Sequence, residues 1–145
     1  MIRFLAVEEL DQYAGRLIEG AAQLPGTAVS TPERFLEKCR GLYTFGLGGV
    51  FGWFVGEDLA GSLCAFVSND FYTDEFIALE LFWNVRPEYR HLPGWRGLFT
   101  AYETWAVSRG ATAIYLTHWS DQDRVGALFT TLGFKLSELH YRKDV

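Results

Sequence analysis

The strongest constraint on the fold is an apolar strand that leads through a basic turn into an amphipathic helix. The run from Ile77 to Val85 is almost entirely apolar, which is typical of a strand covered on both faces. Pro87 disfavours helix at the residue before it and so marks the end of this strand. Apolar residues then recur with helical spacing, and they predict a helix that starts near Gly94 and ends before Gly110.

The turn between this strand and this helix has the composition of an anion site. It holds three basic residues, Arg90, His91 and Arg96, together with Gly94 and Gly97. Such a turn gathers backbone N–H groups and the positive end of a helix at one point, and glycine lets a ligand approach the backbone closely. The sequence therefore predicts that the turn binds an anionic group. The alternative is a solvated turn that only connects a strand to a helix.

Motifs in and after this turn resemble the GNAT family of N-acetyltransferases. The order of the motifs carries the resemblance more than any single one of them. They are Val85-x-Pro87-x-x-Arg90, Leu98-Phe99, Trp105-Ala106, Gly110-Ala111, Leu132-Gly133-Phe134 and Tyr141-x-Lys143. The resemblance implies a single α/β domain over residues 1–145, with a mixed, mostly antiparallel twisted sheet and helices on both faces.

The same resemblance implies an enzyme that transfers an acetyl group from acetyl-coenzyme A (acetyl-CoA) to a primary amine of a small molecule or a protein, by direct attack. In the family, the turn holds the pyrophosphate of the cofactor, and the backbone of the preceding strand pairs with its pantetheine arm. The residues that the resemblance assigns to the cofactor are Trp83, Val85, Arg90, Gly94, Trp95, Arg96, Gly97, Gln122 and Phe129.

Two parts of the chain depart from the family's pattern. An ungapped reading of the turn places Pro93 and Trp95 where the family usually has small residues, so either the turn is one residue longer or the phosphate cradle is altered. Nearer the C-terminus, Phe129 stands where many members have a tyrosine that protonates the leaving sulfur, and phenylalanine has no proton to donate. Gln122 replaces an asparagine that is often found seven residues earlier.

Glu80 is the first candidate for the base that accepts the proton of the attacking amine. It interrupts an apolar strand, where burial shifts a carboxyl group towards the range in which it works as a base. Strict alternation places it on the face of Ala78, Phe82 and Asn84. A structural ion pair with an arginine across the sheet is the alternative. His118 is the second candidate, with a hydrogen bond to a nearby carbonyl as its alternative role.

Composition and charge limit the classes of protein that fit. A chain of 145 residues with 49% hydrophobic residues suits one globular domain. The net charge of −5 gives no general attraction to nucleic acid or to an anionic membrane. Cys39 and Cys64 fall at predicted core positions as reduced thiols, and this, with the lack of a signal-peptide pattern, predicts a soluble cytoplasmic protein. The scattered cysteines and histidines predict no metal site.

Local patterns predict the remaining elements. Strands are expected over 2–7, 50–55, 59–67 and 112–116, helices over 8–22, from Thr31-Pro32 onwards and from Ser120 to Thr131, a hairpin turn at 56–58, a flexible glycine lead at 46–49, and a bulged last strand over 134–143.

The rival hypothesis is a binding protein on the same scaffold that acts through a protein partner. Aromatic residues make up 17% of the chain, which is more than a small core needs, so some rings are expected in a pocket or an interface. Fold alone does not decide between the enzyme and the binding protein. Assembly as a homodimer is left open.

Overall fold

The computed structural model describes residues 1–19, 30–118, 123–138, 143 and 145. They fall into two compact units, Met1–Tyr115 and Leu116–Val145. Within the described part of the chain, no helix is long and apolar enough to cross a membrane.

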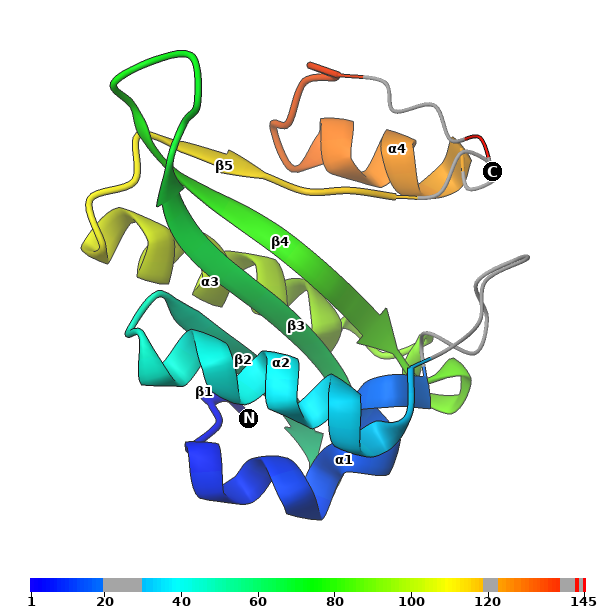
Figure 1. The fold of residues 1–145 in the computed structure, drawn as a ribbon. Coiled ribbons are helices and arrows are strands. Elements are labelled where there is room, and N and C mark those ends of the chain that lie inside the picture. Colours follow the sequence, from blue (N-terminus) through cyan, green and yellow to red (C-terminus); the bar gives the residue numbers. More distant parts are fainter. Residues whose placement is uncertain (20–29, 119–122, 139–142, 144) are drawn as a thin grey trace. The chain divides into compact units, whose positions relative to one another are not determined.

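The first unit is built on a five-stranded mixed sheet (Figure 1). Its strands lie in sequence order, and the first three neighbouring pairs are antiparallel whereas the last is parallel. This confirms the predicted mixed, mostly antiparallel sheet. The strands are β1 (Ile2–Phe4), β2 (Gly48–Val55), β3 (Asp58–Asn69), β4 (Phe76–Val85) and β5 (Ala113–Tyr115).

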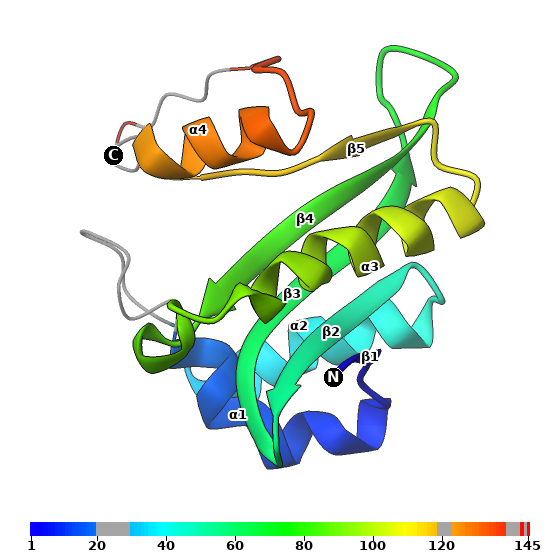
Figure 2. The ribbon, with the colours of Figure 1, turned by 180° about the vertical axis from the view of Figure 1, so that it is seen from behind.

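Helices cover both faces of this sheet, as predicted. Helices α1 (Leu10–Ile18) and α2 (Pro32–Thr44) lie on one face, and α3 (Arg96–Ser108) lies on the other (Figures 1 and 2). Helix α2 begins as predicted, because the Thr31 hydroxyl accepts a hydrogen bond from the Arg34 N–H at 3.4 Å. The connections contain short 3₁₀ helices, among them η1 (Val7–Glu9), η3 (Pro87–Tyr89) and η4 (Pro93–Trp95).

The predicted hairpin between β2 and β3 is confirmed, but its turn is one residue shorter than the predicted 56–58, because Asp58 already belongs to β3. Its register pairs Val55 with Asp58, so two residues connect the strands, and Gly56 takes a φ of 62° that suits glycine. The predicted flexible lead is wrong in part, because Gly48 already belongs to β2. A Cβ there would lie 2.1 Å from the Ala65 carbonyl oxygen, so the glycine serves close strand packing.

Each helical layer packs on its own set of rings and aliphatic side chains. On the α3 face, Phe51 and Trp105 meet edge to face at 5.8 Å, and Trp83 and Phe99 do so at 5.3 Å. The opposite core joins α1 and α2 to the sheet, and both thiols lie in it, as predicted for reduced core cysteines. Its buried members are Leu5, Leu10, Leu17, Leu36, Cys39, Val50, Phe54, Leu59 and Cys64.

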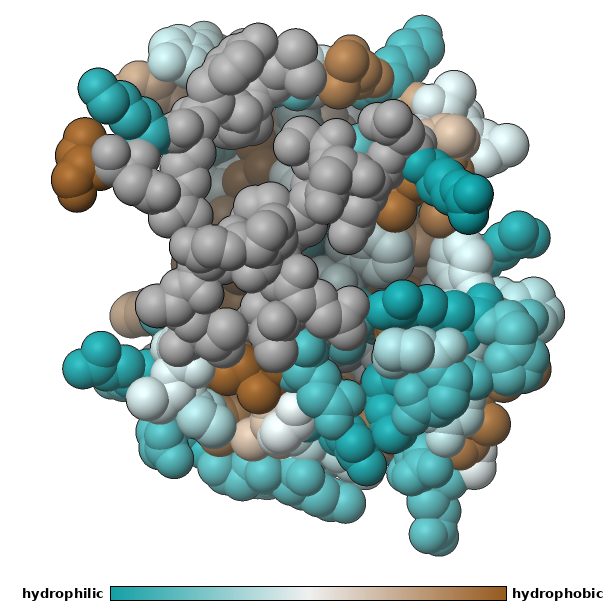
Figure 3. All heavy atoms as spheres, turned by 90° about the vertical axis from the view of Figure 1, so that its right-hand side faces the viewer, coloured by the Kyte–Doolittle hydropathy of each residue, from teal (hydrophilic) through white to brown (hydrophobic). Residues whose placement is uncertain are grey.

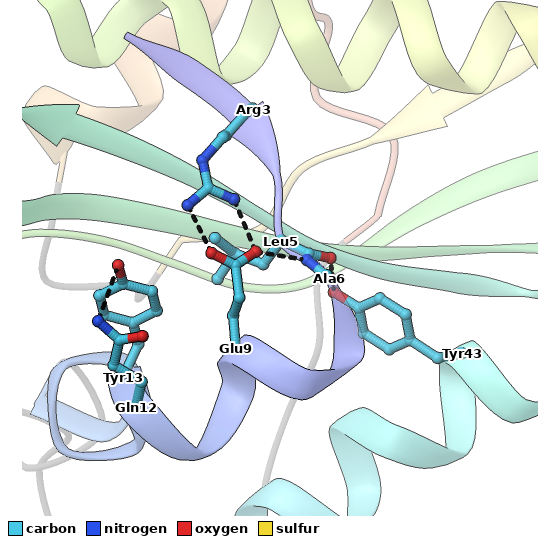
Figure 4. A network of polar contacts seen from close by, with 7 residues as sticks. All are labelled: Arg3, Leu5, Ala6, Glu9, Gln12, Tyr13 and Tyr43. Carbon is cyan, nitrogen blue, oxygen red and sulfur yellow. Dashed lines mark hydrogen bonds and ion pairs between the residues drawn. The ribbon is translucent and has the colours of Figure 1, made fainter.

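A polar network ties the start of the chain to this core (Figure 4). The Arg3 guanidinium donates to both carboxylate oxygens of Glu9, at 2.6 and 2.7 Å, and the Ala6 N–H donates to the same carboxylate at 2.8 Å. The bond from Arg3, followed by that from Ala6, lowers the pKa of Glu9 to about 2. The Arg3 guanidinium also lies 4.7 Å from the centre of the Phe54 ring.

The Tyr43 hydroxyl joins α2 to β2 and to the residue that follows β1. It donates to the Leu5 carbonyl at 3.0 Å and accepts from the Val50 N–H at 2.9 Å. Burial raises the pKa of Tyr43 to about 12. Since Val50 is completely buried, its N–H needs this partner.

The predicted first and last strands differ from the structure. The first strand ends at Phe4, because the chain turns into η1 from Val7. The described part of the predicted last strand, residues 134–138, is not in a strand, and residues 139–142, which include Tyr141, lie outside the described residues.

On the side of the molecule shown in Figure 3, hydrophilic residues cover most of the described surface.

Candidate active site

The predicted strand–turn–helix segment is present. Strand β4 ends at Val85, η3 and η4 form the turn, and α3 follows directly from η4. Proline occupies the first position of both short helices, where a missing N–H costs nothing. The helical geometry therefore begins at Pro93, close to the predicted start at Gly94.

The two arginines assigned to the anion site are both exposed, but they differ in what they contact. The Arg90 Nε donates to the Val85 carbonyl at 2.9 Å and so closes the turn onto the end of the strand. The Arg96 guanidinium lies 5.4 Å from the centre of the Trp95 ring. Among the described residues it forms no ion pair, so its charge is directed towards solvent.

Side chains of the sheet occupy the space beside both glycines of the turn. A Cβ on Gly94 would lie 2.8 Å from the Trp53 ring, and a Cβ on Gly97 would lie 2.2 Å from the end of the Ile2 side chain. The Trp95 ring packs edge to face on Phe99, 6.1 Å between centroids. Close packing against the rigid Trp53 ring therefore explains Gly94 without a ligand, whereas at Gly97 the atom met is the movable end of the Ile2 side chain.

Sequence reasoning missed Arg86, the residue that joins β4 to the turn. Its side chain is only 13% exposed, and it pairs with Glu88 at 2.5 Å and Glu19 at 3.5 Å. Its guanidinium lies 5.4 Å from the centre of the Tyr89 ring, and one terminal nitrogen is buried with no hydrogen-bond partner in the described structure. Its position before Pro87, at the strand end, was the signal available in the sequence.

Strand β4 contains a bulge that changes the predicted face of Glu80. Cys64 pairs with Phe82 and Ala65 pairs with Glu80, so Leu81 is the extra residue. The prediction that Glu80 shares a face with Phe82 and Asn84 is wrong, because the bulge shifts the alternation by one residue. Glu80 instead lies on the α3 face, with Trp83 and Val85.

Glu80 is buried, at 8% exposed, and lies near a buried tyrosine that sequence reasoning missed. Tyr102 of α3 is completely buried, and its hydroxyl donates to the Tyr115 carbonyl at 3.1 Å. Burial raises the pKa of Tyr102, and the Glu80 carboxylate raises it further. The register of β4 with β5 covers Ile77 to Leu79, so Glu80 directly follows the last parallel pair.

In the second unit, the structure brings together two of the predicted site residues. Helix α4 (Asp123–Thr131) carries Phe129, which is 6% exposed, and the exposed His118 ring lies edge to face with it at 5.8 Å. Gly133 follows α4 with a φ of 91°, which confirms it as the predicted helix terminator. Gln122 lies outside the described residues.

A shallow apolar groove lies apart from most of the predicted site. It runs between α3 and β1 in the first unit. Gly97 is the predicted site residue that it contains, and the hydroxyls of Thr104 and Ser108 on its lining donate to carbonyls of α3 itself. Its lining residues are Ile2, Gly97, Thr100, Ala101, Thr104, Trp105 and Ser108.

Comparison with known proteins identifies relatives for this arrangement. The profile described as "Acetyltransferase (GNAT) family" matches residues 21–134. No curated protein matches the chain.

Three solved structures show the same fold, and each match covers 100% of this chain. A putative acetyl transferase from Pyrococcus furiosus is 21% identical, with a TM-score of 0.79 and 100% of its own chain covered. An aminoglycoside acetyltransferase from an uncultured soil metagenomic sample, in complex with sisomicin, is 15% identical, with a TM-score of 0.77 and 95% covered. A transcriptional regulator from Bacillus halodurans C-125 is 17% identical, with a TM-score of 0.81 and 99% covered.

Proposed function

Because the chain belongs to the acetyltransferase (GNAT) family, we propose that it transfers an acetyl group from acetyl-CoA to a primary amine by direct attack. The observation that carries the proposal is the segment in which β4 runs through two proline-started 3₁₀ turns into α3, with Arg90 and Arg96 exposed beside it. This segment offers positive charge and the N–H groups of a helix start at one place, which suits a pyrophosphate.

The donor groups of the turn fit an anionic cofactor. Arg96 is exposed and forms no ion pair in the described part of the chain, and the first N–H groups of a helix lack intrahelical acceptors. The backbone of Trp83 and Val85 would pair with the pantetheine arm, since the described pairing of β4 with β5 stops at Leu79. The turn would contribute only backbone groups at Gly94, Trp95 and Gly97. Neighbouring side chains occupy the space beside the two glycines, and the Trp95 ring packs on Phe99.

The chain's own residues must also remove a proton from the amine. Acetyl-CoA supplies the activated thioester carbonyl when it is bound. An amine enters mostly as an ammonium at neutral pH, and a positioned base contributes roughly 10²–10⁴-fold to such a step. We assign this role to Glu80, because its carboxylate is buried next to the end of the parallel pairing, on the same strand that would hold the thioester.

Thermal unfolding with and without acetyl-CoA tests the cofactor proposal. Millimolar acetyl-CoA should raise the melting temperature of the native chain, because it binds only the folded state. Arg96→Ala should remove most of this rise and leave the cofactor-free melting temperature unchanged, since the side chain is exposed. Arg90→Ala should also lower the cofactor-free value, because the bond to Val85 is lost.

Arg34→Ala is the matched control, since it removes an exposed arginine from α2 on the other face of the sheet. It should leave the cofactor effect intact. A native chain whose melting curve does not move at millimolar acetyl-CoA would refute the proposal.

The acceptor is proposed only as a class, a primary amine of a small molecule or a protein. A panel with an aliphatic diamine, sisomicin and a lysine-containing peptide covers both cases, and acetyl transfer is read by mass spectrometry. Sisomicin is included because a structure of the same fold was solved in complex with it. We further propose that the protein works in the cytoplasm as a single domain, and native mass spectrometry would show whether it forms a homodimer.

A binding protein on the same scaffold is the second candidate, and one observation favours it. Phe71 and Tyr72 are each 91% exposed on the connection between β3 and β4, with their rings 5.2 Å apart. The Asp70 carboxylate holds the connection in shape by accepting from the N–H groups of Tyr72 and Thr73, each at 2.9 Å. Exposed rings of this kind suit a protein partner. Native mass spectra without retained acetyl-CoA would favour this candidate.

A further inference from the structure

We propose that the edge of β1 and the adjoining groove on α3 pair with the same surface of a second copy of this chain, so that one sheet continues across a homodimer. This assembly is independent of the proposed acetyl transfer. Every residue that carries it lies within the first compact unit, Met1–Tyr115.

Strand β1 has main-chain groups that the sheet does not use. It stands at one end of the strand order, and of the described strands it pairs with β2 alone (Figure 2). The main-chain nitrogens of Met1 and Leu5 donate to carbonyls of β2, at 2.9 and 2.8 Å. In an antiparallel pair such bonds occur at every second residue, so the N–H and C=O groups of Ile2 and Phe4 point away from β2. An extended strand beside β1 would find donors and acceptors ready for pairing.

The groove on the α3 side of this edge has no ionisable side chain on its lining, and its volume is about 620 Å³. The hydroxyls of Thr104 and Ser108 already donate to carbonyls of α3, at 2.8 and 2.7 Å. They can therefore be buried without leaving a donor unsatisfied. A charged group entering this groove would lose its hydration without gaining a counter-ion, so the surface suits an uncharged partner face.

The side chains of Ile2 and Phe4 stand on the same side of β1 as the groove. Ile2 is part of its lining, and the Phe4 ring lies 6.5 Å from the Trp105 ring of α3 while it remains 39% exposed. Arg3 lies between them in the strand and points to the other face, where both carboxylate oxygens of Glu9 accept from its guanidinium (Figure 4). Strand β1 thus turns apolar side chains towards the groove, and its charge is already paired.

Two copies of β1 match each other when they run antiparallel about a two-fold axis at Arg3. Ile2 of one copy then lies opposite Phe4 of the other, and each such pair exchanges both main-chain hydrogen bonds. The pair also places a β-branched side chain against an aromatic ring, which is a stabilising combination across neighbouring strands. Each Arg3 brings its own Glu9 as counter-ion, so the symmetric contact adds no unpaired like charges.

The α3 helix is the reason to expect a folded second copy and not a free peptide. Strand β1 has three residues, whereas stable interfaces bury roughly 1,200–2,000 Å² in total, so strand pairing alone is too small. The axis at Arg3 brings both α3 helices to one face of the joined sheet. The side chains of Thr100, Ala101 and Thr104 that line the groove are small, which lets the two helices approach closely and adds the missing contact.

Sedimentation equilibrium of the full chain, from micromolar to millimolar concentration, measures the assembly. The native chain should form a dimer whose fraction rises with concentration. Ile2→Pro removes the outward N–H and costs the monomer no bond to β2, so it should weaken dimerisation by at least about tenfold. Ile2→Val is the matched control, because it keeps the N–H and the β-branched side chain, and it should dimerise like the native chain. Thr100→Glu places a charge in the groove from an exposed position and should weaken the dimer as Ile2→Pro does.

Arg3→Cys tests the register of the two strands. The symmetric antiparallel pairing places the two copies of position 3 opposite each other, at about 4.5 Å between Cα atoms, which a disulfide can bridge. Both native thiols are buried, so oxidised glutathione, which is reduced as two thiols become one disulfide, should link the two chains at position 3. Arg34→Cys changes an exposed arginine of α2 in the same way and should give little linked dimer.

Three results would overturn the proposal, and each would leave the acetyl transfer standing. A native chain that remains monomeric at millimolar concentration has no such assembly. A dimer that neither Ile2→Pro nor Thr100→Glu weakens, although both variants melt as folded proteins, uses another surface. A dimer that Arg3→Cys links no better than Arg34→Cys does not pair its β1 strands about Arg3.

Discussion

Gly94→Ala is expected to lower the free energy of unfolding by about 1–2 kcal/mol. The added Cβ would lie 2.8–2.9 Å from three atoms of the Trp53 indole, which is itself 4% exposed and so has little room to move. Overpacking of this kind costs about 1–3 kcal/mol, whereas replacing glycine by alanine restricts the unfolded chain and returns about 0.4–1 kcal/mol. The difference between these two effects sets the expected loss.

Urea unfolding followed by tryptophan fluorescence measures this loss without any cofactor. If the free energy of unfolding falls by about 2 kcal/mol per molar urea, the urea concentration at the unfolding midpoint should fall by about 0.5–1 M. Gly41→Ala is the matched control, because position 41 lies inside α2 with nothing within 4 Å of the added Cβ. It makes the same chemical change and should raise the stability by up to about 1 kcal/mol.

A second background tests whether Trp53 is the cause. Trp53→Phe removes the part of the indole that the new Cβ would meet, so the cost of Gly94→Ala should be smaller in that variant than in the native chain. An equal cost in both backgrounds, or no cost in the native chain, would refute the steric explanation. The small size of Gly94 would then have to be explained by approach of a ligand.

The remaining predictions concern two polar anchors and the proposed base. Tyr43→Phe should cost about 1–3 kcal/mol in urea unfolding at pH 7, because the buried N–H of Val50 loses its partner. The native chain should lose stability as the pH rises from 10 to about 12, because folding raises the pKa of Tyr43 to about 12; this loss should be smaller in the variant, where Tyr102, whose pKa burial also raises, still contributes. Folding lowers the pKa of Glu9 from 4.5 to about 2, so its contribution is present above pH 4.5 and lost as the pH falls towards 2; Glu9→Gln should flatten this acid limb in thermal unfolding. Glu80→Gln should lower kcat by at least about tenfold with acetyl-CoA affinity unchanged, and a variant that does not fold would show that Glu80 is a structural ion-pair partner instead.

The sequence by itself determined the order and type of most elements. The apolar run before Pro87 and the helical spacing after it were enough to predict β4, the turn and α3. Thr31-Pro32 was enough to predict the start of α2. These predictions hold because proline geometry, helix capping and hydrophobic period act between residues close in the chain.

Only the tertiary structure decided where the candidate site residues lie and what they contact. The bulge at Leu81, which moves Glu80 to the α3 face, arises from pairing with β3 and leaves no local pattern. The glycines of the turn looked like room for a ligand, but Trp53 and Ile2 fill the space beside them. Which neighbour lies against a residue depends on how distant segments pack, and packing between segments far apart in the chain is not encoded in any short stretch of it.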